Sequence, residues 1–396
     1  MDKPVQDHLT PLNPTSKGIL HLWIPNMFEF KGGIQVYSDF LLRAIRSTAI
    51  FKHSEVFLKH DRQVALSTEM WPNFRFHCFG GWPKALRTVA YAISLLLWGC
   101  LKRPQLIFTT HLNFIPVAYG LKRFLGIPYW TVAHGVDAWN IRAPLLKASL
   151  RHADLILAVS HYTRSRLLIE QNLDENQVVV LPNTFETKRF KIAAKSPVLL
   201  KRYQLHIEQP VILTVSRLSS SERHKGYDQI IKALPEIRRA LPTIHYILVG
   251  KGSDRPRIEQ MIAELDLQDC VTLAGFVSDN ELCDHYNLCD VFAMPSKSEG
   301  FGIVYLEALA CGKPTVGGNQ DGAIDALRNG ELGVLVDPEN VKEIASTLIE
   351  ILQGKSPHPI LYKPEILREK VDATYGFPRF QANLSALLKE FDLAAS

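Results

Sequence analysis

A glycine-rich turn that carries two glutamates is the most informative stretch of this 396-residue chain. Glu299 precedes Gly300 and Gly302 of the turn, and Glu307 follows in an apolar run that predicts a helix. Glycines let a ligand approach the main chain closely, and the first N–H groups of a helix bind phosphate. The two carboxylates, roughly 8–12 Å apart at 1.5 Å per residue, can hold hydroxyls at two ends of one ligand. The alternative is a buried, capped helix with two incidental acids.

A second candidate group is cationic and follows the apolar run 211–215, which predicts a buried strand. Arg217 and Lys225 lie in the loop after this run. Such loops, at the carboxyl ends of parallel strands, are where open α/β sheets bind ligands. A guanidinium fork and a lysine charge together match a diphosphate. Arg223 in the same loop competes with Arg217 for this role, and a solvated basic loop is the alternative.

Together these stretches resemble the signature of the retaining, two-domain glycosyltransferases of family GT4. The resemblance covers almost the whole chain and is most specific over residues 216–323. It implies the α/β GT-B fold, in which two Rossmann-like domains face each other across a deep cleft and a C-terminal helix crosses back to the first domain. It also implies transfer of a hexose-type sugar from a UDP- or GDP-sugar to a hydroxyl of a glycan, lipid-linked or glycolipid acceptor, with retention of configuration.

The resemblance further implies a role for each matching residue. Glu299 contacts hydroxyls of the donor sugar, and Glu307 binds the nucleotide ribose. Arg217 and Lys225 neutralise the leaving diphosphate, so no cofactor and no metal are expected; no Asp-x-Asp pair stands at a strand end to hold a divalent ion. The other expected donor-binding positions are Gly33, Gly250, Phe276, Val277, Gly300, Phe301, Gly302, Ile303 and Val304.

Two strand ends in the first half of the chain carry histidines. His134 with the following glycine resembles the His-Gly element of the family, in which the histidine contacts the donor near its anomeric carbon. Asp137 can orient this histidine or meet a sugar hydroxyl. His111 and Asn113, after another strand, are the candidate acceptor contacts. The alternative for each is an ordinary structural residue at a strand end.

The chain departs from the family pattern at two places. In the resembling family the loop at Gly33 faces the diphosphate, and Lys31 is then a possible phosphate contact. Ile34 and Gln35 stand where family members often carry a charged pair, and a plain turn is the alternative there. Thr184 replaces the glycine of the family's Pro-Asn-Gly turn.

Short apolar runs alternate with helical stretches along both halves of the chain, which predicts parallel sheets covered on both faces. We expect residues 1–190, completed by a terminal amphipathic helix over 377–396, to form the acceptor-binding domain. Residues 191–376 then form the donor-binding domain. The expected strands lie at 19–24, 106–110, 129–133, 155–159 and 178–181, and again at 211–215, 246–250, 271–273, 291–294 and 314–316.

The overall composition fits a large globular protein, and the cysteine usage fits a cytosolic one. The chain exceeds the size of a single core, and its formal net charge of +5 suits an anionic ligand or lipid surface better than nucleic acid. The six cysteines are scattered without metal-binding spacing, which predicts mostly buried, reduced thiols. The N-terminal stretch with Asp2, Lys3 and Asp7 has no apolar segment typical of a secretory signal.

One apolar run, 89–101, bears on membrane contact. It lacks charges but is flanked by Lys84, Arg87, Lys102 and Arg103. The run is too short to span a bilayer, and a buried helix is the favoured interpretation. A helix resting on the cytoplasmic face of an anionic membrane is the alternative, because many enzymes that resemble this chain build lipid-linked glycans.

Other functions remain as rivals at this stage. A nucleotide-sugar epimerase shares the two-domain fold, and a non-catalytic sugar-nucleotide-binding subunit could keep the donor pocket. The joint presence of His134, Arg217, Lys225 and Glu299 speaks against the second. A dehydrogenase is disfavoured because the first glycine loop lacks the full dinucleotide-binding spacing.

Overall fold

The computed structural model describes residues 18–29, 32–48, 50–64 and 71–395. It contains two compact units. The first comprises Met1–Thr131, Ala143–Leu155 and Gln381–Ser396, and the second comprises Val132–Arg142 and Ile156–Phe380. The predicted division at residue 190 stays a prediction. Lys31 and the N-terminal residues used above to argue against a secretory signal lie outside the described residues.

A seven-stranded sheet has the order β3-β2-β1-β4-β5-β6-β7, and its strand pairs are parallel. Its strands are β1 (Gly18–Ile24), β2 (Phe51–Leu58), β3 (Phe74–Cys78), β4 (Leu106–Thr109), β5 (Tyr129–Ala133), β6 (Leu155–Ala158) and β7 (Val178–Val180). The five apolar runs expected in this half all form strands. The sequence reading missed β2 and β3, because polar residues such as Lys52, His53 and Arg75 interrupt their hydrophobic pattern.

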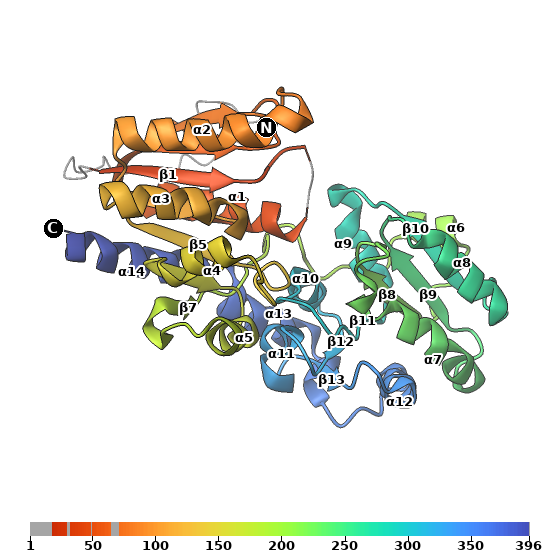
Figure 1. The fold of residues 1–396 in the computed structure, drawn as a ribbon. Helices are drawn as coiled ribbons and strands as arrows, with labels where there is room; N and C mark the ends of the chain where they lie inside the picture. The colour runs from red at the N-terminus through yellow and green to blue at the C-terminus, as the bar shows by residue number, and fades with distance from the viewer. Residues whose placement is uncertain (1–17, 30–31, 49, 65–70, 396) are drawn as a thin grey trace, which may run out of the picture. The chain divides into compact units, whose positions relative to one another are not determined.

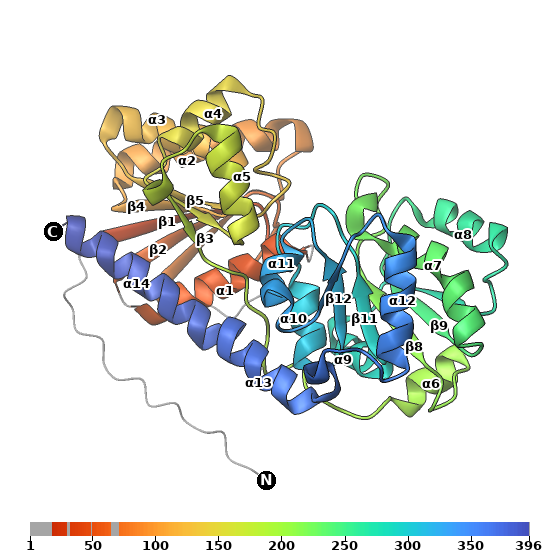
Figure 2. The same ribbon diagram turned by 90° about the horizontal axis from the view of Figure 1, so that it is seen from below.

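Helices cover both faces of this sheet (Figure 1). Figure 2 shows α2, α3 and α4 on one face and α1 and α14 on the other. The helices are α1 (Gly33–Thr48), α2 (Lys84–Lys102), α3 (Ile115–Leu125), α4 (Pro144–Arg151), α5 (His161–Gln171) and the last helix of the chain, α14 (Phe377–Ala395). Short 3-10 helices lie at Leu112–Phe114 and Glu175–Gln177.

A six-stranded parallel sheet in the second unit has the order β10-β9-β8-β11-β12-β13. Its strands are β8 (Val211–Val215), β9 (His245–Val249), β10 (Val271–Gly275), β11 (Val291–Met294), β12 (Thr315–Gly318) and β13 (Val334–Val336). The sequence reading missed the three-residue β13. The helices here are α6 (Pro197–Tyr203), α7 (Tyr227–Ala240), α8 (Arg255–Glu264), α9 (Asp279–Leu288), α10 (Ile303–Ala310), α11 (Ala323–Ala326), α12 (Val341–Leu352) and α13 (Pro364–Tyr375). Short 3-10 helices occupy Arg223–Lys225, Arg328–Gly330 and Pro359–Tyr362.

One hydrophobic cluster holds this second sheet against α7, α8 and α12. Ile230 and Leu234 of α7 and Ile344 and Leu348 of α12 are fully buried in it. Their spacing of four residues places each pair on one helical face. The rigid core fixes the carboxyl ends of β8 and β11, where the candidate site lies.

Helix α2 corrects the expectation of a buried helix over 89–101. It is longer than that run, and only Tyr91, Leu95 and Gly99 are buried. Its outer face exposes a row of large apolar side chains, namely Leu86, Val89, Ile93, Leu96, Leu97 and Leu101. In the described part of the chain α2 is also the one helix whose length and composition would allow it to cross a membrane.

The predicted terminal helix is present as α14. Phe380, Leu384 and Leu388 are buried at the four-residue spacing of an amphipathic helix. Near its end, Phe391 packs edge-on against Trp130 of β5, with the ring centroids 5.5 Å apart.

The cysteines differ in part from expectation: all six are free thiols, but Cys100 is exposed and Cys78 and Cys283 are half-buried.

Candidate active site in the second unit

The glycine-rich turn leads from β11 into α10, as the sequence predicts. Gly302 adopts φ 87° and precedes the first residue of the helix. A Cβ atom at this position would lie 2.5 Å from the ring of Tyr305, so only glycine fits. No side chain caps the N-terminus of α10. Ile303 and Val304 are the first residues of α10, and no side chain caps their N–H groups. This is the arrangement that the sequence analysis expects for a phosphate site.

A buried carboxylate that the sequence analysis did not single out holds this turn in place. Asp321 accepts hydrogen bonds from the N–H of Glu299 at 2.6 Å, from Ser296 Oγ at 2.7 Å and from the N–H of Ala323 at 2.9 Å. Burial raises the pKa of Asp321 to about 7. In the sequence, Asp321 is marked only by its position in a polar turn after β12. Its contact with the backbone of Glu299 becomes evident only in the folded structure.

The segment after β5 packs directly on the same turn within the second unit. A Cβ atom built on Gly300 would lie 1.8 Å from the carbonyl oxygen of His134, and one on Gly135 would lie 2.6 Å from the Cα atom of Gly300. Ser160 Oγ donates a hydrogen bond of 2.7 Å to the carbonyl oxygen of Gly300. The structure thus brings His134 to the double-glutamate turn, and Ser160, at the start of α5, is a further contact that the sequence analysis missed.

Asp137 contacts the backbone of the same histidine. The N–H of His134 donates to Asp137 Oδ1 at 3.1 Å. Asp137 Oδ2 is buried and has no hydrogen-bond partner among the described residues. Burial raises the pKa of this carboxyl to about 7. A buried oxygen without a hydrogen-bond donor is unfavourable. The bond to Asp137 Oδ1 holds the main chain at His134 in place.

Lys225 forms an ion pair with Glu299. Each of these side chains is only 16% exposed. Two backbone features bring them together: the N–H of Lys297 donates to the carbonyl oxygen of His224 at 2.9 Å, and Gly226, at φ 85°, packs against Pro295. The cation and the turn predicted to share a ligand are therefore neighbours.

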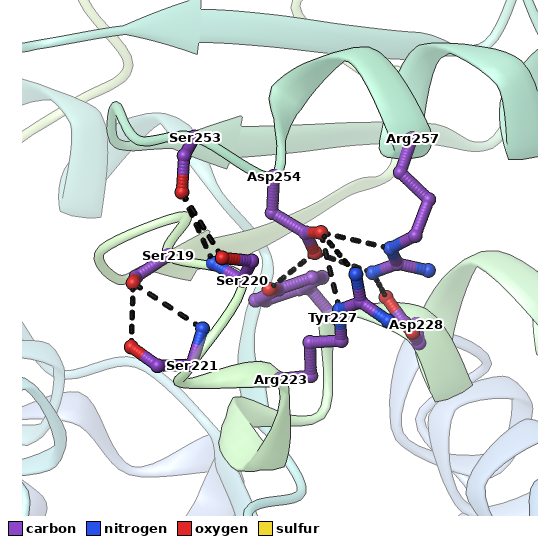
Figure 3. Close-up of polar contacts among 9 residues, drawn as sticks. All are labelled: Ser219, Ser220, Ser221, Arg223, Tyr227, Asp228, Ser253, Asp254 and Arg257. Atoms are coloured by element: carbon purple, nitrogen blue, oxygen red, sulfur yellow. Dashed lines mark hydrogen bonds and ion pairs between the residues drawn. The ribbon is translucent and has the colours of Figure 1, made fainter.

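Arg217 and Arg223 have different surroundings. Arg217 is 61% exposed and contacts Glu222, with Nη2 2.5 Å from Oε1. Arg223 instead donates from Nε to Asp254 Oδ1 at 3.1 Å. Figure 3 shows that Asp254 also accepts from Tyr227 and Arg257. Arg223 thus belongs to a structural network, which leaves Arg217 as the candidate for the ligand.

The cations and acids of these loops lie within electrostatic reach of one another. Burial lowers the pKa of His224, and Lys225 and Arg217 lower it further while Glu299 and Glu222 act in the opposite direction. The loop between Arg217 and Arg223 is held by hydroxyls, because Ser219 Oγ lies 2.9 Å from Ser221 Oγ (Figure 3). A diphosphate here would meet two cations that already have carboxylate partners.

Glu307 lies farther along α10 in a buried setting. Tyr286 of α9 donates its hydroxyl to Glu307 Oε2 at 2.7 Å. Burial raises the pKa of Glu307 to about 7, from an ordinary value near 4.5. Glu299 and Glu307 therefore differ in surroundings: the first is paired with a cation and the second is held in a low-dielectric site.

The loops after β9 and β10 carry the other donor-binding candidates. Gly250, at φ 145°, packs so closely on β8 that a Cβ atom would lie 1.8 Å from the carbonyl oxygen of Ser216. Phe276 is 69% exposed, and Lys251 Nζ lies 4.9 Å from the centroid of its ring. An exposed aromatic ring beside the cationic loop can stack on a planar base. Val277 follows it and is half-buried.

Three candidates lie in the first unit. Gly33 begins α1, and a Cβ atom there would meet no atom of the described chain within 4 Å, so packing does not require glycine. His111 Nδ1 accepts from the N–H of Asn113 at 3.1 Å. Burial, Lys59 and His60 lower the pKa of His111. Asn113 itself lines a pocket in this unit.

No group of three or more histidine, cysteine or acidic side chains among the described residues is arranged to hold a metal ion. The candidate site is instead built from two cation–carboxylate pairs, a helix N-terminus and three carboxyls in buried settings. This arrangement can bind a diphosphate and several hydroxyls, and it can stabilise charge on a departing phosphate.

Comparisons with known proteins agree with this chemistry. Residues 32–189 match the profile of "Glycosyltransferase Family 4", and residues 198–365 match that of "Glycosyl transferases group 1". A GDP-mannose-dependent alpha-(1-6)-phosphatidylinositol monomannoside mannosyltransferase of Mycobacterium tuberculosis is 32% identical over 274 residues, which are 66% of this chain and 69% of the relative. An alpha-D-kanosaminyltransferase of Streptomyces kanamyceticus is 25% identical over 284 residues, or 68% of this chain and 70% of the relative.

Solved structures give the same fold. A sucrose-phosphate synthase from Thermosynechococcus elongatus superposes with a TM-score of 0.78 at 23% identity, covering 96% of this chain and all of that one. HepE of Anabaena, solved with UDP, gives a TM-score of 0.74 at 19% identity, over 94% of this chain and all of that one. The comparisons do not favour an epimerase or a non-catalytic subunit. This chain belongs to the GT4-type glycosyltransferases and has the GT-B fold.

Proposed function

We propose that this glycosyltransferase moves a hexose-type sugar from a nucleoside diphosphate sugar to a hydroxyl of a lipid-linked or glycolipid acceptor, with retention of configuration and without a metal. The Lys225–Glu299 pair at the N-terminus of α10 is the observation that carries the proposal. It places a cation and a carboxylate at the turn that leads into α10, whose N-terminus no side chain caps, and a sugar diphosphate needs a cation, a carboxylate and N–H donors.

GDP-mannose is the first candidate donor, because the relative at 32% identity is named as GDP-mannose-dependent. Other GDP-sugars and UDP-sugars are the comparison donors. Phe276 offers its exposed ring to the base, and Glu307 accepts hydrogen bonds from the ribose. The amide groups at Ile303 and Val304 hold the diphosphate.

In the reaction, the bond between the anomeric carbon and the diphosphate oxygen breaks, and the acceptor oxygen forms the new bond on the same face of the sugar while its proton passes to an oxygen of the departing diphosphate. Negative charge grows on the departing diphosphate, where Lys225 and Arg217 stabilise it. Glu299 releases part of its contact with Lys225 and holds the hydroxyls of the sugar. His134 contacts the sugar near the anomeric carbon, since the backbone contact of Gly135 with Gly300 supports it there.

The acceptor side belongs to the first unit, with His111 and Asn113 as contacts. The exposed apolar row of α2, flanked by Lys84, Arg87, Lys102 and Arg103, supports reversible binding to the cytoplasmic face of an anionic membrane. An enzyme that rests there meets a lipid acceptor without extracting it from the bilayer.

Protection against thermal unfolding tests the donor assignment. A donor present at 100 times its Kd adds about 2.7 kcal/mol of stability. GDP-mannose is expected to raise the unfolding temperature more than the other GDP- and UDP-sugars, with free mannose as the control. If no nucleotide sugar protects the folded protein, the proposal is wrong. The anomeric configuration of the product, measured by nuclear magnetic resonance, tests retention.

A further inference from the structure

A pocket in the first unit has walls of two different kinds. Its volume is about 270 Å³. Apolar residues of α2 and α3 line it on the helical side, which we call the apolar wall. Polar residues also line it, among them Lys59 just beyond β2. The lining residues are Lys59, Thr88, Tyr91, Ala92, Leu95, Asn113, Phe114 and Val117. A cavity with these two walls suits an amphiphile.

The Lys59 ammonium forms no ion pair with a described residue. No hydrogen bond or ion pair links the Lys59 ammonium to another described side chain, and its charged neighbour is the cationic Arg87. Arg87 donates its own hydrogens to the carbonyl oxygens of Gly80 and Trp82. Burial, with a contribution from Arg87, lowers the pKa of the Lys59 ammonium. Two neighbouring cations, neither of them in an ion pair with a described carboxylate, favour an anionic ligand.

Two acids of the same unit, Asp61 and Glu29, accept hydrogen bonds from the backbone. Asp61 accepts from the N–H groups of Met27, Phe28 and Glu29, at 2.6, 2.9 and 3.0 Å. Glu29 accepts from the N–H of Arg62 at 2.9 Å. These hydrogen bonds fix both carboxylates on the loop after β1, and no described carboxylate forms an ion pair with Lys59.

The apolar wall continues to the exposed face of α2. Thr88, Ala92 and Leu95 line the pocket at helical spacing, while Val89 and Ile93 immediately beside them are exposed. On an α-helix these two rows are adjacent. An acyl chain leaving the pocket would therefore run directly along the apolar row that we assign to the membrane.

We infer that this pocket binds the phosphate-bearing headgroup of the lipid acceptor, with Lys59 contacting the phosphate and the α2 wall covering the first methylenes of the acyl chain. Asn113 then faces the polar part of the headgroup. The inference rests on the proposed function, because it assumes that the acceptor is a lipid.

Calorimetric binding of three probes tests the inference: dibutanoyl phosphatidylinositol, inorganic phosphate and dibutanoylglycerol, which lacks phosphate. Lys59→Gln removes the charge and keeps most of the side-chain length. Lys52→Gln is the matched control, since Lys52 is an exposed lysine of β2, the strand that precedes Lys59. We expect Lys59→Gln to weaken phosphatidylinositol binding about tenfold or more, the scale of a charge-assisted hydrogen bond. Lys52→Gln and Lys59→Arg should bind nearly as wild type does.

Each other outcome overturns the inference. Unchanged affinity in Lys59→Gln, or no binding of phosphatidylinositol by wild type, removes the site. Inorganic phosphate bound as tightly as the lipid would make it a site for free phosphate, and equal binding of dibutanoylglycerol would make it an uncharged apolar pocket. Thermal protection by GDP-mannose, measured on the same variants, separates the two proposals. If GDP-mannose protects the protein but lipid binding does not depend on Lys59, only the pocket assignment is rejected. If lipid binding depends on Lys59 but GDP-mannose gives no protection, only the donor assignment is rejected.

Discussion

At the scale of single residues, the site depends on how its charges are paired. Lys225 is joined to Glu299 and Arg217 to Glu222, so neither cation is an isolated charge. A diphosphate can replace a carboxylate partner at each one, because it offers several oxygens to the same donors.

Replacing either cation by alanine should lower the rate of sugar transfer. We expect Lys225→Ala and Arg217→Ala each to reduce kcat about 10²–10³-fold, the scale for losing one charge-stabilising group. Arg255→Ala is the control, since Arg255 forms an exposed pair with Glu259 on α8. Initial rates at saturating donor measure the effect. Wild-type turnover in both folded variants would show that the diphosphate lies elsewhere.

The buried Glu307 should make stability depend on pH. Its folded pKa of about 7 lies above the ordinary value near 4.5, so between these values the unfolded chain has lost a proton that the folded chain keeps. Its contribution is fully present below about pH 4.5 and is lost as the pH rises to 7. Glu307→Gln should therefore be more stable than wild type at pH 8, by on the order of 1–3 kcal/mol.

Urea unfolding at several pH values between 5 and 8 measures this difference, which should shrink as the pH falls. The control is Glu331→Gln, because Glu331 forms an exposed pair with Arg328. A difference between Glu307→Gln and wild type that does not change with pH would contradict the raised pKa.

At the scale of elements, two backbone segments are pressed together where the site forms. The turn before α10 touches the loop after β5 at Gly300 and Gly135, and Ser160 at the start of α5 bonds to the same turn. The position of His134 thus depends on main-chain packing, which side-chain types alone do not encode.

A methyl group at this contact should disrupt the site. Gly300→Ala would place its Cβ atom 1.8 Å from the carbonyl oxygen of His134, and we expect a loss of about 1–3 kcal/mol in unfolding free energy together with weaker donor binding. Gly120→Ala, within α3, is the control, because a Cβ atom there meets nothing within 4 Å. That change should be neutral or stabilise the helix by roughly 0.5–1 kcal/mol. Equal stability of the two variants would refute the close contact.

Helix α2 should carry the protein to anionic membranes. We expect cosedimentation with vesicles rich in phosphatidylglycerol at low salt and release at high salt, because each basic residue near the surface contributes about 1 kcal/mol. Replacing Lys84, Arg87, Lys102 and Arg103 with Gln should reduce the bound fraction, and so should replacing Val89, Ile93 and Leu97 with Ser. Ile169→Ser, at an exposed isoleucine of α5, is the control. Unchanged sedimentation in both sets would leave α2 without a membrane role.

At the scale of the whole molecule, the enzyme combines a cation-rich candidate donor site in one unit with an apolar, basic surface in the other. Sugar transfer should continue in excess EDTA, because the proposed mechanism gives Arg217 and Lys225 the charge stabilisation that a metal performs in other enzymes. Product formation with and without EDTA, and after adding Mg²⁺ or Mn²⁺ back, is the measurement. An absolute requirement for either ion would contradict the proposed mechanism.

Local patterns in the sequence determined the family, most strands and the principal charged residues. The turn from Glu299 to Gly302 can be read without tertiary information, because its glycines and the following apolar helix are contiguous. The apolar runs at β1, β8, β9 and β11 are likewise unbroken, as strands buried on both faces must be. In β2 and β3, polar residues obscure that pattern, so β2 became evident only from its pairing with β1 and β3 only from its pairing with β2.

Contacts between distant segments could be decided only by the tertiary structure. Asp321 under Glu299, Tyr286 on Glu307 and Ser160 on Gly300 join residues that lie 22, 21 and 140 positions apart, and nothing in their local sequence marks the partner. The exposure of helix α2 is another property that only the tertiary structure decides. Its composition indicates an apolar helix, but the sequence does not tell whether a neighbouring element covers its apolar face, because burial is a property of the packed fold.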